Sequence, residues 1–347
     1  MAKIAINGMG RIGRAAFKVI METPQLELVA VNDLMPTDNL AYLIRYDTVY
    51  GKYGKDVTVK GDSLSVGGKS FKVLHEKDPE QLPWKEMEVD LVIESTGFFT
   101  KAPDMQKHIK AGARMVILSA ESKSDEVATV VYGASSTQPE NPTLVSCASC
   151  TTNCITPLVE IMGRRIGIKK AVLTTVHAYT ATQTLVDGPM KKEFSRGRAA
   201  AQNLVPTTTG AATATTKALP EYKGKFDGVS VRSPVPVGSI SDVVFVTSRP
   251  TTVDEIKKVF REEAQSARYR DVLGVSDEPI VSSDIIQDPR ASVVDLDMTR
   301  VVDGDLVKVM SWYDNEWGYA NQMIREAVSM TSGSREAELT ASAQKGK

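Results

Sequence analysis

Apolar, strand-like runs alternate with helical patterns along the first part of the chain. The strand-like runs cover residues 3–7, 26–31, 89–94 and 115–118, and helical patterns cover residues 14–22 and 101–111. Strands that alternate with amphipathic helices are typical of a parallel sheet covered by helices. A shorter period-two alternation at 57–60, 63–66 and 71–74 predicts a small antiparallel insert joined by glycine turns. The first part of the chain therefore predicts a doubly wound α/β domain.

The second part of the chain has a different pattern. Strand-like alternation recurs at 170–177, 228–232, 241–247, 292–297 and 306–312. One helical pattern begins near residue 150, and others cover 203–219, 253–266 and 319–330. Residues 178–209 show no clear periodicity. Several strands in succession with few intervening helices favour an antiparallel sheet. We therefore expect an α+β domain with a largely antiparallel sheet, and a functional role for the long irregular segment.

Glycines punctuate the junction between the first strand and the first helix. Residues 8–13 read Gly-Met-Gly-Arg-Ile-Gly, and Asp33 ends the next strand, at the distance of about 20 residues that dinucleotide-binding units show. The glycines permit a tight turn and close approach of a pyrophosphate to the helix N-terminus. Asp33 can accept hydrogen bonds from a ribose diol and would repel a 2′-phosphate. The pattern favours NAD over NADP, and a glycine-rich turn without a ligand is the alternative.

Other polar residues follow the strands of the same predicted sheet. Thr96 and Gly97 come after the run at 89–94, and Ser119 follows the run at 115–118. Cofactors bind at the carboxyl ends of the strands in such sheets. We therefore expect Gly8, Asp33, Thr96 and Ser119 to line the cofactor site.

A cysteine stands where a helix is predicted to begin. Cys150 lies between the hydroxyl residues Ser149 and Thr151 and precedes a helical pattern. Free N–H groups and the positive end of the helix dipole lower the pKa of a thiol. The position predicts a nucleophilic thiolate at Cys150.

A base within hydrogen-bond reach would complete a cysteine nucleophile. Of the three histidines, only His177 ends a predicted buried strand in the same part of the chain as Cys150, whereas His75 and His108 lie in polar, surface-like contexts. A single histidine at a strand end is often structural, so that alternative stays open. Cys147 and Cys150 also fit a redox dithiol. No second ligand pair has zinc-like spacing, so we expect no metal.

The bulk composition excludes several classes of protein. The 347 residues carry a formal net charge of −1, which provides no basic surface for nucleic acid or for anionic membranes. Apolar runs are short and interrupted by charge, well below the roughly 20 residues of a membrane span. Three cysteines within residues 147–154 do not form a disulfide framework. The N-terminus has no signal-peptide pattern, so we expect a cytoplasmic protein with no nucleic-acid or membrane partner.

Several stretches together resemble one known family. They are Ala-Ser-Cys-Thr-Thr-Asn-Cys at 148–154, Ile-Asn-Gly-Met-Gly-Arg-Ile-Gly-Arg at 6–14, Trp-Tyr-Asp-Asn-Glu-Trp-Gly-Tyr at 312–319, His-Ala-Tyr-Thr at 177–180, Thr-Gln at 182–183, Asp-Gly-Pro at 187–189 and Thr-Thr-Thr-Gly-Ala-Ala at 207–212. In this order they resemble phosphorylating glyceraldehyde-3-phosphate dehydrogenases. The resemblance runs from about residue 3 to residue 330.

The resemblance implies a reaction and a set of ligands. Cys150 would attack glyceraldehyde 3-phosphate, His177 would act as general base, and inorganic phosphate would release 1,3-bisphosphoglycerate from a thioester while NAD is reduced. The C3 phosphate would be held by Thr180, Thr182 and Arg232, and the attacking phosphate by Ser149, Thr151, Thr209 and Gly210. The cofactor would be held by Asn7, Gly8, Gly10, Arg11, Ile12, Asp33, Thr96, Gly97, Ser119, Asn315 and Tyr319.

The resemblance also implies domains, an assembly and rivals. Residues 1–149, completed by a helix at 316–330, would form a Rossmann-type NAD-binding domain. Residues 150–315 would form the catalytic domain, and 331–347 a polar tail. The family is homotetrameric. An erythrose-4-phosphate dehydrogenase and a non-catalytic nucleotide-binding scaffold are the alternatives. Cys147 stands where the family usually has Asn, and Ser195 where many relatives have Arg.

Overall fold

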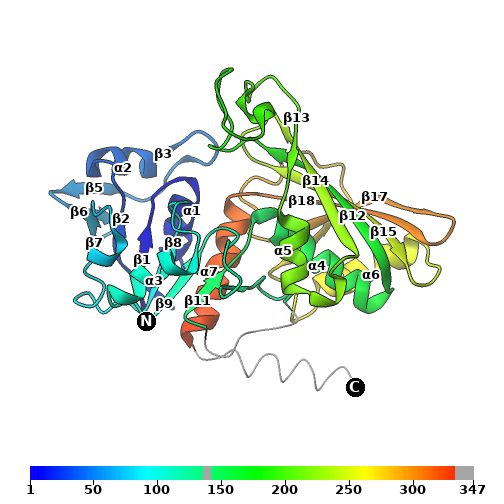
Figure 1. Ribbon diagram of the computed structural model, residues 1–347, viewed down its shortest axis with the longest axis horizontal. Helices are drawn as coiled ribbons and strands as arrows, with labels where there is room; N and C mark the ends of the chain where they lie inside the picture. Colours follow the sequence, from blue (N-terminus) through cyan, green and yellow to red (C-terminus); the bar gives the residue numbers. More distant parts are fainter. Residues whose placement is uncertain (136–141, 333–347) are drawn as a thin grey trace. The chain divides into compact units, whose positions relative to one another are not determined.

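The computed structural model describes residues 1–135 and 142–332 (Figure 1). These residues form two compact units. Unit 1 comprises residues 1–130, 142–148 and 323–332, and unit 2 comprises residues 131–135 and 149–322. The polar tail predicted at 331–347 lies outside the described residues from residue 333 onward.

Unit 1 is built on a mainly parallel sheet. Its described strands run in the order β10-β11-β9-β8-β1-β2-β7-β6-β5. They are β1 (Ala2–Asn7), β2 (Leu26–Asn32), β5 (Val57–Lys60), β6 (Ser63–Val66), β7 (Lys69–Leu74), β8 (Leu91–Glu94), β9 (Met115–Leu118), β10 (Ala128–Thr129) and β11 (Leu144–Ser146). Pairing is parallel from β10 to β7 and antiparallel in β7-β6-β5. The parallel sheet and its antiparallel insert confirm the predicted α/β class.

The helices of unit 1 show where the sequence pattern was incomplete. Helix α1 (Arg11–Ile20) begins inside the glycine motif, three residues before the predicted start. Helix α3 (Ala102–Lys110) matches its prediction closely. Helix α2 (Thr37–Arg45) and the short β3 (Tyr46–Asp47) and β4 (Gly51–Lys52) ribbon were not predicted. Helix α2 buries only Thr37, Leu40, Ala41 and Ile44, so its apolar stripe is too short to detect with confidence from periodicity.

Unit 2 contains the mostly antiparallel sheet. Its described strands run in the order β13-β14-β12-β15-β18-β17-β16. They are β12 (Ile168–Ala178), β13 (Val205–Thr208), β14 (Phe226–Ser233), β15 (Ser239–Thr247), β16 (Leu273–Ser276), β17 (Ser292–Val302) and β18 (Leu306–Tyr313). Only β12–β14 and β16–β17 pair in parallel. The arrangement confirms the predicted α+β character of the second part of the chain.

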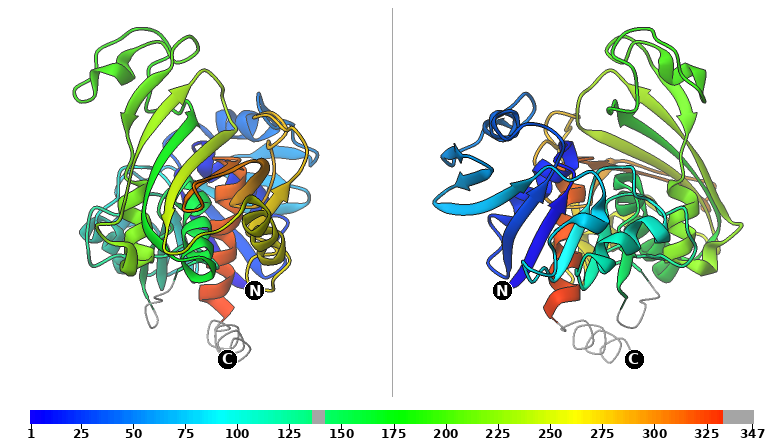
Figure 2. Two further views of the ribbon diagram at one scale, coloured as in Figure 1. Left: turned by 90° about the vertical axis from the view of Figure 1, so that its right-hand side faces the viewer. Right: turned by 60° about the vertical axis from the view of Figure 1, so that its left-hand side comes forward.

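Three helices pack against one face of this sheet. They are α4 (Cys150–Arg165), α5 (Ala211–Ala218) and α6 (Val253–Ala264), and Figures 1 and 2 show them gathered on the same side of the curved strands. Alternate sheet residues such as Leu173, Phe245 and Val309 meet helix residues such as Leu158 and Phe260 in one buried core. The period-two and period-3.6 patterns therefore converge on a single apolar layer. Helix α7 (Trp317–Ser332) closes the described chain.

The long segment after β12 contains one wrong prediction. The helix expected at 203–219 is instead strand β13 followed, after Thr209 and Gly210, by α5. Pro206 lacks an N–H group and disfavours helix before it, and β-branched threonines follow at 207–209. The segment, which extends past the sheet in Figures 1 and 2, is organised by Glu193. Its carboxylate accepts hydrogen bonds from the hydroxyls of Thr207 and Thr208 and pairs with Arg196 at 2.8 Å.

Candidate active site

The two candidate catalytic side chains of unit 2 lie together. Cys150 is the first residue of α4, and the Ser149 side chain caps this helix by accepting a hydrogen bond from the Thr152 N–H. His177 lies near the end of β12. The Cys150 Sγ atom is 3.3 Å from His177 Nε2. A helix start and a strand end, 27 positions apart in the sequence, thus bring a thiol and an imidazole into hydrogen-bond range.

The other ring nitrogen fixes the tautomer of His177. His177 Nδ1 lies 2.7 Å from the Ala178 carbonyl oxygen, which can only accept a hydrogen bond. Nδ1 therefore carries the proton. An Arg232 Nη1 atom also lies 3.1 Å from Nδ1, but two donors cannot bond to each other, and this guanidinium donates to the same Ala178 oxygen at 3.0 Å. The unprotonated Nε2 is left facing the thiol, as a general base requires.

Burial moves the pKa values of both groups away from neutrality. It raises the pKa of the Cys150 thiol to about 11, against the opposing effects of the Arg232 charge and of hydrogen bonds from Thr151. Burial, with the Arg232 charge acting in the same direction, lowers the pKa of His177 to about 4. The helix N-terminus was expected to lower the pKa of this thiol, whereas desolvation of the charged form acts in the opposite direction and is the larger effect. Burial therefore favours the uncharged form of each group.

Tyr313 belongs to this cluster, although the sequence analysis gave it no role. Its hydroxyl lies 2.8 Å from Thr151 Oγ1 and 2.9 Å from Thr175 Oγ1. Its ring meets the His177 ring edge-on, with 5.9 Å between centroids. Tyr313 therefore ties α4 to β12 and limits the rotation of the imidazole. Its place at the end of β18, within the quoted motif, was the only signal in the sequence.

Arg232 is brought to the site by strand register. Strands β12 and β14 pair in parallel, with His177 opposite Arg232. Arg232 Nη1 lies 3.4 Å from Thr180 Oγ1, and Thr180 Oγ1 lies 2.9 Å from Thr182 Oγ1. One guanidinium and two hydroxyls thus converge within unit 2. These are groups that can bind a phosphate.

The four residues predicted to hold the attacking phosphate lie at two helix starts. Ser149 and Thr151 are at the start of α4, and Thr209 and Gly210 are at the start of α5. Hydroxyls of this set already have local partners: Ser149 caps α4, Thr151 contacts Tyr313, and Thr209 accepts from the Ala211 N–H. Contacts between Thr156 and Thr215 hydroxyls join the two helices at 3.2 Å. This contact fixes α4 and α5 relative to each other, and with them the two helix starts.

Asn315 has a fixed amide orientation. Its Oδ1 accepts hydrogen bonds from the Gly238 N–H at 3.1 Å and from the Ser239 hydroxyl at 3.0 Å. The amide nitrogen of Asn315 is therefore the end that points away from β15. Tyr319, the other cofactor residue predicted in this unit, is buried in α7.

The glycine motif of unit 1 forms a close turn between β1 and α1. Gly8 has φ of +94°, and a Cβ atom there would lie 2.6 Å from the Thr96 nitrogen. A Cβ at Gly13 would lie 2.0 Å from the Gly8 carbonyl oxygen, whereas Gly10 has nothing within 4 Å of that position. Gly8 and Gly13 are thus required by packing, and Gly10 faces open space. Space beside the first N–H groups of α1, including those of Arg11 and Ile12, suits a pyrophosphate.

The remaining cofactor candidates lie at the neighbouring strand ends. The Asp33 Oδ2 atom accepts a hydrogen bond from the Met9 N–H at 2.6 Å, so this carboxylate also holds the glycine turn. The Ser119 N–H donates to the Glu94 carbonyl at 2.9 Å, which places Ser119 beside the end of β8 with Thr96 and Gly97. The Arg11 guanidinium pairs with Asp47 at 2.6 Å and lies over the Tyr50 ring. The glycine motif and the neighbouring strand ends thus place these residues at one edge of the sheet.

One histidine was misplaced by the sequence analysis. His108 is completely buried and not at the surface. It lies on the inner face of α3, between Trp84 and Glu94, in a helix with many polar residues. Polar neighbours along the sequence hid a histidine on the buried face.

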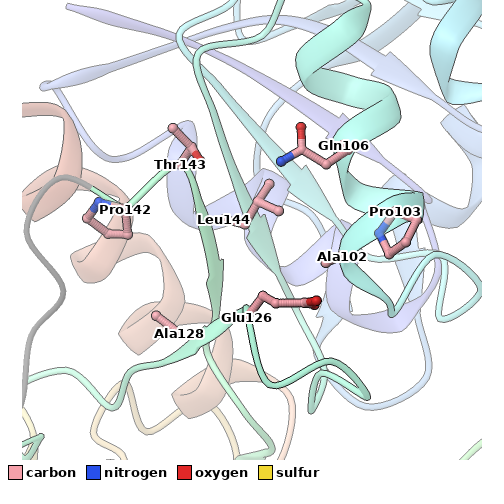
Figure 3. A pocket seen from close by; sticks show the side chains of 8 residues that line it. All are labelled: Ala102, Pro103, Gln106, Glu126, Ala128, Pro142, Thr143 and Leu144. Carbon is pink, nitrogen blue, oxygen red and sulfur yellow. The ribbon is translucent and has the colours of Figure 1, made fainter.

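A surface hollow of unit 1 contains none of the predicted site residues. It is lined by Ala102, Pro103, Gln106, Glu126, Ala128, Pro142, Thr143 and Leu144 (Figure 3). Glu126 is the one ionisable side chain of this lining, so the hollow offers no paired groups for catalysis. Within residues 1–135 and 142–332, no cluster of His, Cys, Asp or Glu suits a metal ion. No helix in these same ranges has the length and apolarity of a membrane span.

Comparison with known proteins matches both parts of the chain. Residues 2–102 match the family model described as glyceraldehyde 3-phosphate dehydrogenase, NAD binding domain. Residues 149–315 match the model described as glyceraldehyde 3-phosphate dehydrogenase, C-terminal domain. The chain belongs to the glyceraldehyde-3-phosphate dehydrogenase family.

Relatives within this family align over nearly the whole chain. Glyceraldehyde-3-phosphate dehydrogenase 2 of Streptomyces avermitilis is 46% identical over 325 residues, which cover 93% of this chain and 96% of the relative. Glyceraldehyde-3-phosphate dehydrogenase 1 of Bacillus subtilis is 43% identical over 324 residues, with 93% and 96% covered. The enzyme of Geobacillus stearothermophilus is 43% identical over 332 residues, with 95% and 98% covered. Family membership therefore rests on both parts of the chain, and NAD as cofactor on the match of residues 2–102 and on the relatives.

Proposed function

We propose that the protein oxidises glyceraldehyde 3-phosphate with NAD and inorganic phosphate to 1,3-bisphosphoglycerate. The observation that carries the proposal is the Cys150–His177 pair, with 3.3 Å between Sγ and Nε2, beside the Arg232–Thr180–Thr182 group. A nucleophile, a base and an anion site in a chain of this family fit an acyl-transferring aldehyde dehydrogenase. The names of the relatives favour glyceraldehyde 3-phosphate over erythrose 4-phosphate and over a scaffold.

The first step uses the neutral pair. As Cys150 Sγ forms a bond to the aldehyde carbon, His177 Nε2 takes the thiol proton and delivers it to the former carbonyl oxygen, giving a hemithioacetal. Proton transfer during attack avoids a buried thiolate, which the raised pKa of Cys150 makes costly. The Nδ1–H bond to the Ala178 carbonyl holds the ring in the productive tautomer and supports its transient positive charge.

The second and third steps use the same two residues. His177 Nε2 removes the hydroxyl proton while the hemithioacetal carbon loses a hydride, and a thioester to Cys150 remains. NAD, when bound, supplies the acceptor for that hydride. An oxygen of hydrogen phosphate then attacks the thioester carbon and the carbon–sulfur bond breaks, which releases the acyl phosphate. The proton of the hydrogen phosphate passes to the departing sulfur and restores the Cys150 thiol. The proton gained by His177 passes to solvent.

The binding roles follow from the chemistry of the groups. Arg232, Thr180 and Thr182 bind the C3 phosphate, and the starts of α4 and α5, with Ser149, Thr151, Thr209 and Gly210, bind the attacking phosphate. Oxygen acceptors of a phosphate match a guanidinium, hydroxyls and backbone N–H groups. The already bonded hydroxyls of Ser149 and Thr151 would act through a second lone pair or through exchange of partner.

The residues of unit 1 fit the cofactor. Open space at Gly10 and the close turn at Gly8 admit a pyrophosphate, and Asp33 accepts hydrogen bonds from a ribose diol. The turn at 8–13, the strand-end residues Asn7, Thr96, Gly97 and Ser119, and the amides of Arg11 and Ile12 hold the dinucleotide. Asn315 donates its amide N–H to the nicotinamide carboxamide, and Tyr319 supports it. Residues 1–149 with helix 316–330 thus act as the NAD-binding domain, and 150–315 as the catalytic domain.

The assembly and the location are part of the same proposal. A homotetramer in the cytoplasm is what the family resemblance implies. Leu185, Val186, Phe194 and Leu204 of the segment after β12 are exposed in the single chain, and clustered exposed apolar side chains mark protein contacts. Sedimentation at several concentrations measures the assembly directly, and a monomer at all of them would remove this part of the proposal.

NADH formation tests the activity. The purified protein is mixed with NAD and glyceraldehyde 3-phosphate, with and without inorganic phosphate, and erythrose 4-phosphate is tried in parallel. The proposal expects sustained turnover only with phosphate and preference for glyceraldehyde 3-phosphate. Turnover that is indifferent to phosphate indicates a hydrolysing aldehyde dehydrogenase, and absence of turnover with intact NAD binding indicates a scaffold.

A further inference from the structure

A buried chain of polar side chains lies beneath the glycine turn of unit 1. Glu94 ends β8 and His108 lies on α3, and both side chains are fully buried. Glu94 Oε2 and His108 Nε2 are 3.1 Å apart. Trp84, also fully buried, lies on the other side of the imidazole. Buried polar groups are costly unless they are hydrogen-bonded. The hydrogen-bond partners of these side chains therefore indicate what role the buried polar groups have.

Trp84 fixes the protonation of His108. The Trp84 Nε1–H donates to His108 Nδ1 at 3.0 Å, and an indole nitrogen can only donate. Nδ1 therefore has no proton, and the proton of the neutral ring is on Nε2. His108 must then donate to Glu94. The histidine is held as a neutral donor.

Glu94 collects hydrogen bonds from the two strand ends that flank the glycine turn. Its Oε2 accepts from the Asn7 amide at 2.6 Å and from His108. Its Oε1 accepts from the Thr96 N–H at 2.8 Å and from the Thr96 hydroxyl at 2.5 Å. Four donors point at two oxygens, which matches an ionised carboxylate. Glu94 thus joins the residue before Gly8 to the residue that Gly8 packs against.

The same connections reach a third strand end. Asn7 Oδ1 accepts from the Asn32 amide at 2.7 Å, and Asn32 exchanges hydrogen bonds with the Glu76 backbone. The Gly8 N–H donates to the Asn32 carbonyl at 2.8 Å, directly before Asp33. A Cβ at Gly8 would lie 2.6 Å from the Thr96 nitrogen, so this turn tolerates little displacement. The carboxylate therefore sets the spacing of the ends of β1, β2 and β8.

We propose that Glu94 and His108 are positioning residues for the dinucleotide: His108, held by Trp84, orients the Glu94 carboxylate, which fixes Asn7 and Thr96 around Gly8. The proposal rests on the proposed function of this edge of the sheet as the NAD site. Neither residue contacts the cofactor in this account. An apolar pair of similar volume would fill the space without a desolvation cost, so the hydrogen bonds from Asn7 and Thr96, beside the glycine turn, to Glu94 indicate a positioning role.

Paired substitutions at His108 test the proposal. His108→Leu fills the space but removes the donor to Glu94, whereas His108→Gln keeps an N–H donor at the position of Nε2. We expect His108→Leu to raise the Kd of NAD about tenfold and His108→Gln about threefold or less, because misplaced binding groups lose affinity. The KM of NAD should rise in the same order, with kcat at saturating NAD largely retained. Binding is measured by isothermal titration calorimetry of the full chain with NAD.

Two further variants separate positioning from stability. Met105→Ala removes a fully buried apolar side chain from the same helix, outside the hydrogen-bonded chain, and should lower the Tm without changing the Kd of NAD. Glu94→Gln conserves shape but places amide hydrogens among four donors, and should raise the Kd as His108→Leu does. Glu94→Gln therefore provides the test of positioning if His108→Leu does not fold.

The outcomes distinguish this proposal from the proposed function. Tenfold weaker NAD binding in His108→Leu, with rescue by His108→Gln, supports positioning. Unchanged Kd values in folded His108→Leu or Glu94→Gln, or an equal loss in Met105→Ala, overturn the positioning role while NAD binding by the unsubstituted protein stands. Failure of the unsubstituted protein to bind NAD overturns the proposed function and the positioning role together.

Discussion

Helices α1 and α4 both begin just after the end of a parallel strand, but their first turns are built differently. Helix α1 follows β1, and its N-cap residue is Gly10, which has no side chain. Helix α4 follows β11, and its N-cap is Ser149, whose hydroxyl accepts from the Thr152 N–H. Both helix starts have the same dipole and the same first-turn N–H groups that lie outside the i to i−4 pattern of the helix. The start of α1 has no side-chain cap and is the proposed pyrophosphate site, whereas the start of α4 uses a first-turn N–H group to hold the Ser149 side chain next to Cys150.

The comparison shows that a helix N-terminus does not by itself define a chemistry. At Gly10 the backbone is the functional group and the side chains are absent. At Cys150 a side chain is the functional group, and burial raises its pKa to about 11 in spite of the helix. We therefore expect His177, with Nε2 3.3 Å from the Cys150 Sγ atom, to generate the reactive state of Cys150.

The largest effect is expected at the base. His177→Asn removes the acceptor of the Cys150 proton, and we expect kcat to fall about 10²–10⁴-fold, the usual contribution of a positioned general base. The Kd of NAD should not change, because His177 is not among the residues assigned to the dinucleotide. Val176→Ala, a neighbour on the opposite face of β12, is the control and should keep kcat. A kcat close to that of the unsubstituted protein in His177→Asn would contradict the account.

The two glycines of the α1 turn should respond in different ways. Gly13→Ala places a Cβ 2.0 Å from the Gly8 carbonyl, so the free energy of unfolding should fall by about 1–3 kcal/mol, the usual cost of overpacking. Gly10→Ala meets nothing within 4 Å, so its stability loss should stay below about 1 kcal/mol, while the added methyl obstructs the pyrophosphate and raises the Kd of NAD. Thermal unfolding and calorimetry measure the two quantities. Normal NAD binding in Gly10→Ala would contradict the assignment of this helix start.

A smaller effect is expected in the pH dependence of the thiol. The Arg232 charge lowers the pKa of Cys150, against the larger effect of burial. Removing that charge in Arg232→Gln destabilises the thiolate, so the midpoint of the alkylation rate with iodoacetamide should move to higher pH, by about one unit. Arg198→Gln, which breaks an exposed pair with Asp187, is the control. A midpoint that does not move would show that Arg232 has no influence on the thiol, and a midpoint that moves to lower pH would contradict the sign of its effect.

The smallest effect is expected at the α4 cap. Ser149→Ala removes the acceptor of the Thr152 N–H, and helix caps contribute about 1 kcal/mol. Denaturant unfolding should show a loss of that size. Thr252→Ala at the similar cap of α6 is a matched control for stability without an effect on turnover. An unchanged stability in Ser149→Ala would mean that the N–H groups of α4 have other partners.

Much of the fold was predictable because burial imposes clear periods on the sequence. The strands of both sheets were found where one face or both faces are apolar, as in β8 and β15. Prediction was wrong where local sequence and burial disagree. Helix α2 has a short apolar stripe, and Pro206 with its threonines turns an apparent helix into β13.

The candidate site was predictable where its residues are neighbours in the sequence. It was less predictable where the residues come from distant segments of the chain. The glycine turn and the Cys150 helix start are local motifs. The register of β12 and β14 brings Arg232 to His177, and packing brings Tyr313 to Thr151. Neither contact can be predicted from the local spacing of residues in the sequence. The tautomer of His177 depends on the Ala178 carbonyl, and the net pKa of Cys150 on burial. These properties require the three-dimensional structure.

The central claim, a thioester on Cys150, has a direct test. The protein is mixed with glyceraldehyde 3-phosphate and NAD without phosphate, quenched in acid and digested for mass spectrometry. The account predicts a burst of NADH close to one equivalent per chain and an acyl group on Cys150, discharged when phosphate is added and absent in Cys150→Ser. An acyl group on Cys147 or Cys154, or turnover in Cys150→Ser, would contradict the account.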